Sequence, residues 1–84
     1  MTKDIGERIR ERLQECPKGL VMVTIKFTKD GTYLRIDFLN KKWETLEEHK
    51  KLKEEKILRK VYDVIWEVLR LKKRFLMTAH VQNE

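Results

Sequence analysis

Apolar residues at the start of the chain recur at the spacing of an α-helix. Ile5, Ile9 and Leu13 lie four residues apart, and charged side chains fill most of the positions between them. This spacing places the apolar side chains on one narrow stripe of a helix. The pattern predicts an amphipathic helix over residues 1–16, with Thr2 as its N-cap.

The period changes to two between residues 20 and 39, where apolar and polar side chains alternate. Such alternation is typical of β-strands that are buried on one face. An Asp-Gly pair at residues 30–31, which is favoured in two-residue hairpin turns, separates two alternating runs. The segment therefore predicts an antiparallel β-hairpin over residues 20–39. Its apolar positions are Val21, Val23, Ile25 and Phe27, followed by Leu34, Ile36 and Phe38.

Pairing the two strands about that turn gathers their apolar side chains on one face, with Ile25 opposite Ile36. The other face then places Lys26 directly across from Arg35, and like charges across a strand pair are unfavourable. Two explanations stay open for this face. Either a local salt bridge to Asp37 relieves the repulsion, or an anion from a partner binds between the two cations.

Residues 41–76 are expected to form one long helix with two unlike halves. Residues 44–56 are mostly charged, with Glu and Lys spaced for ion pairs along a helix. Residues 57–76 hold 12 apolar side chains among 20, a surface wider than a small hairpin can cover. We expect a tail over residues 77–84. The alternatives are a break in the helix near residues 49–53, or a short third strand within residues 77–82.

Together these elements predict a single α+β domain over residues 1–84 with the order α-β-β-α, a central antiparallel hairpin and a long C-terminal helix. A continuous helix over residues 44–76 would be about 50 Å long, and a lone two-stranded hairpin is marginally stable in water. Both features favour a homodimer that completes the fold. The expected interface positions are Val61, Tyr62, Ile65, Trp66, Val68 and Leu69.

The charge balance favours an anionic partner. The chain has 20 Lys and Arg against 14 Asp and Glu, a net charge of +6. The excess is concentrated in residues 17–43 and 68–84. A structural role stays open for the second group, because cations near a helix C-terminus also complement the helix dipole. The candidate nucleic-acid-binding residues are Lys26, Lys29, Tyr33, Arg35, Arg70, Lys72, Lys73 and Arg74.

The sequence contains no motif for catalysis or metal binding. His49, His80 and Cys16 are not spaced as a metal site requires, and HExxH, CxxC, GxSxG and glycine-rich phosphate motifs are absent from the sequence. We therefore expect no enzymatic activity, no cofactor and no small-molecule substrate. A lone cysteine and the lack of a long apolar run favour a cytoplasmic protein without membrane contact.

Short segments of the predicted strands occur in a recognisable order between residues 19 and 76. They are Gly19-Leu20-Val21, Val23-Thr24-Ile25 and Arg35-Ile36-Asp37. With these segments, the predicted order of elements resembles the small nucleoid-associated proteins of the YbaB family. That resemblance implies a dimer that binds DNA.

Two functions from different classes are consistent with the sequence. The first is a small basic protein that binds DNA or RNA mainly through backbone phosphates, because no base-reading motif is present. The second is a protein-interaction module, such as a regulator, inhibitor or assembly subunit encoded by a mobile element. That module would use the wide apolar face and the aromatic residues of the C-terminal helix.

Overall fold

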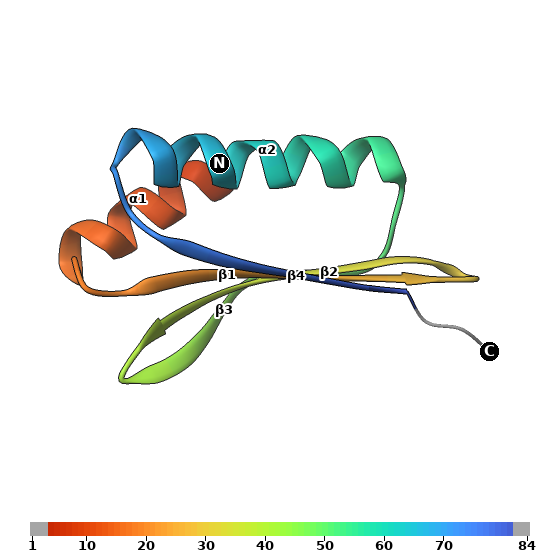
Figure 1. Ribbon diagram of the computed structural model, residues 1–84, viewed down its shortest axis with the longest axis horizontal. Helices are drawn as coiled ribbons and strands as arrows, with labels where there is room; N and C mark the ends of the chain where they lie inside the picture. Colours follow the sequence, from red (N-terminus) through yellow and green to blue (C-terminus); the bar gives the residue numbers. More distant parts are fainter. Residues whose placement is uncertain (1–3, 82–84) are drawn as a thin grey trace.

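Two helices pack on one face of a four-stranded mixed sheet (Figure 1). The computed structural model describes residues 4–81. The sheet order is β3-β2-β1-β4, with β1 and β2 antiparallel, β2 and β3 antiparallel, and β1 and β4 parallel. The predicted α-β-β-α order with a long C-terminal helix is therefore wrong. In chain order the elements are α1 (Ile5–Glu15), β1 (Leu20–Thr28), β2 (Gly31–Asn40), β3 (Lys42–Leu52), α2 (Glu54–Arg70) and β4 (Phe75–Val81).

The first helix forms where its apolar stripe predicts it. Ile5, Ile9 and Leu13 are all buried in α1. The Asp4 side chain caps the helix by accepting a hydrogen bond from the Glu7 backbone N–H at 2.8 Å. Thr2, the expected cap, lies outside the described residues. An acidic cap also suits the positive end of the helix dipole.

The predicted hairpin is present as β1 and β2, but its register differs by two residues. Thr28 lies opposite Gly31, Lys26 opposite Tyr33, and Ile25 opposite Leu34. Thr28 Oγ1 donates to the Gly31 carbonyl at 2.6 Å, and Gly31 has φ +140°, which glycine adopts readily. A shift of two preserves both faces of the sheet, because side chains alternate with period two. The expected pairing of two like charges across the ladder does not occur.

Residues 42–52, predicted as helix, instead form the edge strand β3. Leu46 is the one residue of β3 that is fully buried, so the apolar signal of a strand is weak here. Register shifts next to Leu34 and Asp37 in the partner strand interrupt the alternation further. The Glu, Lys and Leu content of this segment favours helix, and pairing with β2 overrides that weak preference.

The long helix is also interrupted at its C-terminal end, after Arg70. The Lys73 N–H donates to the Val68 carbonyl at 2.8 Å, and the Lys72 N–H donates to the Leu69 carbonyl at 3.0 Å. Lys72 has φ +56°. These two bonds form a Schellman motif, which usually places glycine where Lys72 lies. The chain then turns back and forms β4. This strand lies close to the one expected within residues 77–82 as an alternative to the tail.

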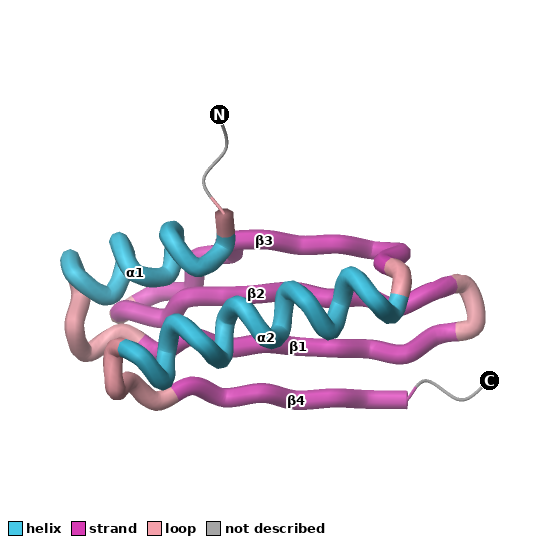
Figure 2. The backbone as a smooth tube through the Cα atoms, turned by 90° about the horizontal axis from the view of Figure 1, so that it is seen from above, coloured by secondary structure: helices cyan, strands magenta, loops and turns pink. Residues whose placement is uncertain are grey.

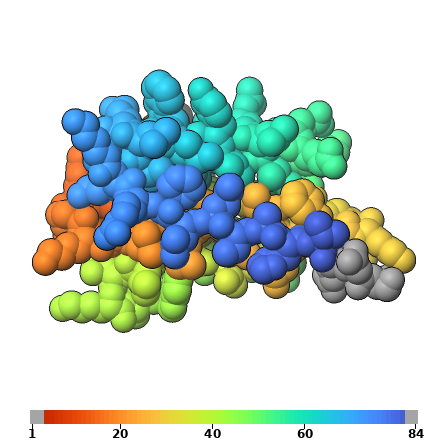
Figure 3. Space-filling model, in the orientation of Figure 1, coloured from red at the N-terminus to blue at the C-terminus, as the bar shows by residue number. Residues whose placement is uncertain are grey.

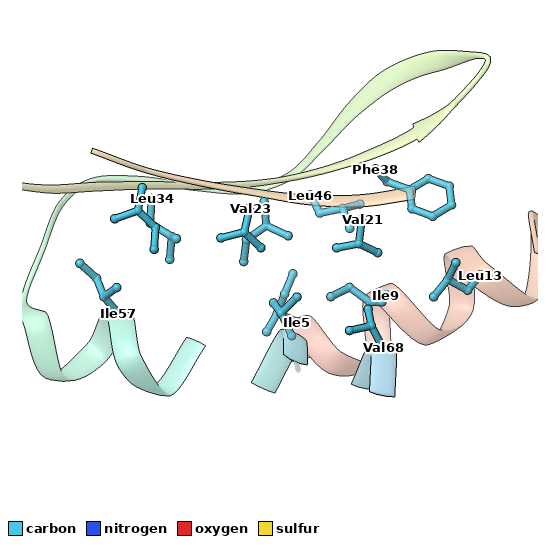
Figure 4. Close-up of a cluster of buried hydrophobic side chains, with 13 residues drawn as sticks. Ile5, Ile9, Leu13, Val21, Val23, Leu34, Phe38, Leu46, Ile57 and Val68 are labelled. Atoms are coloured by element: carbon cyan, nitrogen blue, oxygen red, sulfur yellow. The ribbon is translucent and has the colours of Figure 1, made fainter. Parts of the chain in front are cut away.

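The core lies between the helices and the sheet (Figure 4). Ile5 and Ile9 from α1 and Ile57 and Val68 from α2 meet the inward side chains of β1 and β2. The inward residues of the sheet are Val21, Val23, Ile25, Leu34, Ile36, Phe38 and Leu46.

Polar contacts hold one side of α2 against α1 and β3. Glu47 of β3 forms ion pairs with Lys60 of α2 and with Arg8 of α1, the latter at 3.9 Å. Glu67 of α2 pairs with Arg10 of α1 at 3.8 Å. The side of α2 with these residues therefore faces α1 and β3. Its opposite side faces the edge of the sheet that β4 forms. Figure 2 shows that neither of the two described helices lies over β4.

Candidate functional site

Lys26, Tyr33 and Arg35 lie together on the sheet face that the helices leave open. The guanidinium of Arg35 is held by a carboxylate of the same strand, because its Nε donates to Asp37 Oδ2 at 2.8 Å. Thr45 Oγ1 donates to the other oxygen of Asp37 at 2.9 Å. Asp37 is 4% exposed and thus depends on these two partners. The hydrogen bond to Asp37 and the negative charge of that residue raise the pKa of Arg35.

Tyr33 is likewise engaged by an acidic neighbour. Its hydroxyl donates to Glu48 Oε2 at 2.5 Å, and Lys26 Nζ lies 5.5 Å from the centre of its ring. The hydrogen bond to Glu48 and burial raise the pKa of Tyr33. This face thus balances two cations against two carboxylates. In addition, β1 and β2 are interior strands of the sheet, so they do not form a free ribbon that could enter a DNA groove.

A more uniformly basic group forms where two loops meet at the other end of β1. The loop after α1 and the loop after α2 together line an open groove, whose apolar lining residues include Leu20, Leu69 and Phe75. Lys73 Nζ donates to the Pro17 carbonyl at 3.1 Å, which ties the two loops together. Among the residues that the structure describes, those that line the groove include no Asp or Glu. We call its four cations the basic loop cluster: Lys18, Lys72, Lys73 and Arg74.

The eight predicted nucleic-acid-binding residues do not form one site. Lys29 lies in the β1–β2 turn, at the far end of β1 from the basic loop cluster. The nine residues of β1 separate these ends by about 30 Å. Arg70 belongs neither to the residues on the open sheet face nor to the basic loop cluster. Its guanidinium binds Glu67 of the same helix at 3.0 Å.

Large apolar side chains are exposed along the side of α2 that faces the β4 edge. Leu58, Tyr62, Trp66 and Leu69 are between 59% and 72% exposed. The rings of Tyr62 and Trp66 are stacked, with centroids 6.5 Å apart. Of the other predicted interface positions, Val61 and Ile65 are half-buried beside this stripe. Val68 is fully buried in the core and so has no surface to offer a partner.

β4 adds further exposed apolar side chains, Met77 and Val81 among them. Figure 3 shows the β4 strand beside α2 on this face of the molecule. Met77 and Ala79 lie opposite Val23 and Ile25 of β1, which places them on the helix side of the sheet. Val23 and Ile25 are buried beneath the helices, whereas both β4 residues are exposed. The α2–β4 surface, as we call it, consists of Leu58, Tyr62, Ile65, Trp66 and Leu69 of α2 with Met77, Ala79 and Val81 of β4.

The two edges of the sheet differ in their protection against pairing. β3 has the sequence KWETLEEHKKL, in which six of eleven residues are charged, and its register is irregular. Charges and bulges are the usual devices that prevent an edge strand from pairing with another chain. β4 has the sequence FLMTAHV, with no Asp, Glu, Lys or Arg. The unprotected edge is therefore the one beside the exposed stripe of α2.

Sequence reasoning finds these surfaces only in part. It favours a helix end and a tail where β4 forms, with a short strand within residues 77–82 as an alternative. Lys18 was not grouped with residues 72–74, because only the turn back after α2 brings the two loops together.

Other features of the described residues bear on function class. Within residues 4–81, no cluster of three or more His, Cys, Asp or Glu side chains could hold a metal ion. Neither helix of this part of the chain has the length and apolar character needed to cross a bilayer.

Comparison of the chain with protein-family models, curated proteins and solved structures finds no match. The resemblance to the YbaB family rested on an α-β-β-α order that the chain does not adopt.

Proposed function

We propose that this chain is a protein-interaction module that binds a partner through its α2–β4 surface. The observation that carries the proposal is the exposed apolar stripe of α2 beside an edge strand without charged residues. Contiguous apolar surface of this kind is rare on monomeric proteins and typical of interaction sites. Aromatic residues such as Tyr62 and Trp66 are frequent anchors in protein interfaces.

Both halves of the surface match known modes of protein recognition. An exposed sheet edge can bind an extended strand through backbone hydrogen bonds, and a helix face can pack on a complementary apolar partner. The polar side of α2 is already engaged by α1 and β3, through Glu67 and Lys60. The exposed apolar side chains of α2 lie on the side that continues onto β4, so a partner that recognises them would approach from that side.

The proposal is tested by crosslinking and affinity capture from the source cells with mass spectrometric identification. The surface variant combines Leu58→Ser, Tyr62→Ser and Leu69→Ser. The matched control, Arg59→Gln with Asp63→Asn, changes exposed positions of the same helix outside the stripe. We expect one partner at near-stoichiometric yield with the wild type and the control, and its loss with the surface variant. Equal capture by all three proteins would contradict the proposal.

A second candidate function, nucleic-acid binding, is supported by the basic loop cluster. Four cations line a groove to which the described part of the chain contributes no Asp or Glu. Such a group can neutralise backbone phosphates without reading sequence. Lys18→Gln, Lys72→Gln and Arg74→Gln together should weaken binding to duplex DNA. Each lost phosphate contact should make the salt dependence of binding weaker, lowering the magnitude of the slope of log K against log salt by about 0.9.

The matched control for this candidate is Lys26→Gln with Lys29→Gln, which removes cations near the opposite end of β1. We expect that variant to retain the affinity and the salt slope of the wild type. Unchanged DNA binding by the loop variant, or no measurable binding by the wild type at low salt, would reject nucleic acid as a partner of the basic loop cluster.

A further inference from the structure

We infer that the partner at the β4 edge is a second copy of this chain, bound antiparallel so that the two β4 strands pair about a twofold axis at Thr78. This inference rests on the proposed function and names the occupant of its surface. It accounts for the absence of charge in β4, for the exposure of its helix-side residues, and for the difference between the two edges of the sheet.

The β4 sequence is complementary to itself in this arrangement. An antiparallel register centred on Thr78 pairs all seven residues of β4, with Phe75 opposite Val81, Leu76 opposite His80, and Met77 opposite Ala79. Residues opposite each other in an antiparallel pair share a face. The apolar helix-side residues of one copy therefore meet those of the other, and no residue with a fixed charge is placed across from another.

Pairing at β4 also closes the assembly. A twofold contact uses the same patch on both copies, so it ends at a dimer and does not propagate. The resulting sheet would have eight strands in the order β3-β2-β1-β4-β4-β1-β2-β3. Both of its outer edges would be β3, which carries the charges and register shifts that prevent further pairing.

The twofold axis places both α2 helices on the same side of the extended sheet. The exposed stripe of each helix lies on the side opposite its ion pairs with α1 and β3, so the two stripes would face each other across the central pair of β4 strands. The α2 and β4 parts of the surface would thus belong to one assembly. Because each copy has a net charge of +6, added salt should strengthen this association by screening the repulsion between copies.

The experiment measures molar mass by light scattering for a pair of charge variants at the predicted axis. Thr78→Lys and Thr78→Glu each place like charges directly opposite each other in a homodimer. Each should raise the dimer dissociation constant by roughly tenfold or more. An equimolar mixture of the two variants places opposite charges across the axis and should restore the dimer.

Gln14→Lys, at an exposed position of α1, is the control for added charge and should leave the dimer intact. The inference is overturned if the wild type is a monomer up to submillimolar concentration with a cooperative melt. It is also overturned if the wild type dimerises but neither Thr78 variant weakens the dimer. Partner capture that fails only in the α2 surface variant, with a monomeric wild type, would retain the proposed function and reject the second copy.

Discussion

Trp66 stacks on Tyr62, one helical turn before it, with the ring planes 13° apart, although the two residues are 59% and 64% exposed. The pair belongs to α2, whose other side carries the buried core residues Ile57, Val64 and Val68. One helix thus has two apolar surfaces. The first packs in the core of this chain, and the second is exposed.

Substitutions on the two sides of α2 should therefore separate stability from binding. Tyr62→Ala and Trp66→Ala remove exposed rings, and we expect each to change the free energy of unfolding by about 0.5 to 1 kcal/mol at most under monomeric conditions. Ile57→Ala removes a buried side chain and should cost about 2 to 5 kcal/mol. Urea denaturation at low protein concentration measures both. An equally large loss with Trp66→Ala would mean that the stripe belongs to the core.

Arg35 should prove more important for stability than for phosphate binding. Arg35→Gln deprives the buried carboxylate of Asp37 of its charged partner, and we expect a loss of about 1 to 3 kcal/mol. Lys26→Gln, on the same face, removes only an exposed cation near the ring of Tyr33 and should cost less than about 0.5 kcal/mol. Thermal unfolding of the two variants measures the difference. Equal, small effects would show that Asp37 does not need the guanidinium.

Glu47 should make the stability of the fold depend on pH in the acid range. Burial alone would raise the pKa of Glu47, but hydrogen bonds from Lys60 and His49 and their positive charges lower it below its ordinary value of 4.5. A lowered pKa in the folded state stabilises the protein above the ordinary value. This stabilisation is lost as the pH falls from about 4.5 through the folded-state pKa.

Glu47→Gln tests this dependence through the free energy of unfolding at a series of pH values. We expect the variant to be less stable at neutral pH by about 1 to 2 kcal/mol, because Lys60 loses a charge-assisted hydrogen bond. The difference from the wild type should shrink between about pH 5 and pH 3. A constant difference across that range would show that Glu47 does not titrate as its contacts imply.

The end of α2 offers a stabilising substitution. Lys72 adopts φ +56° at the position of the Schellman motif that glycine usually occupies. Lys72→Gly should therefore stabilise the protein by about 1 kcal/mol. Arg59→Gly, in the middle of the same helix, should instead destabilise it by about 1 kcal/mol. A loss of stability in the Lys72→Gly melt would contradict the assigned helix end.

Gly19 should tolerate no side chain, because it lies against the ring of Phe38 at the start of β1. A Cβ atom at Gly19 would lie 2.0 Å from Phe38 Cζ, and Phe38 is 3% exposed. We expect Gly19→Ala to cost about 1 to 3 kcal/mol through overpacking. Adding Phe38→Leu should recover part of this loss, as measured by chemical denaturation. No loss in the single variant would contradict the packing at this position.

The sequence was sufficient to predict α1 and the hairpin because both carry a complete periodic signal. The stripe of Ile5, Ile9 and Leu13 predicts the helix, and the alternation in residues 20–39 predicts the two strands and their faces. The register was two residues off, because a shift of two leaves the hydrophobic pattern unchanged and only the turn decides between the two registers.

The second half of the chain was predicted incorrectly because its signals are weak or misleading. In β3, only Leu46 is fully buried and the register is irregular, so a charged edge strand resembled a solvated helix. At the end of α2, Lys72 takes the place of the glycine that would have marked the stop. Both the α2–β4 surface and the basic loop cluster depend on that turn, so neither could be assembled correctly from the sequence.

Hydrogen–deuterium exchange at two protein concentrations tests most directly whether β4 pairs with another chain. In the sheet that residues 4–81 form, β4 and β3 are the two edge strands, so the outward amides of each face no other described strand. We expect exchange over residues 75–81 to slow as the concentration rises from low micromolar to submillimolar, while exchange over residues 42–52 stays the same. Equal exchange of residues 75–81 at both concentrations would contradict the pairing of β4 with a second copy.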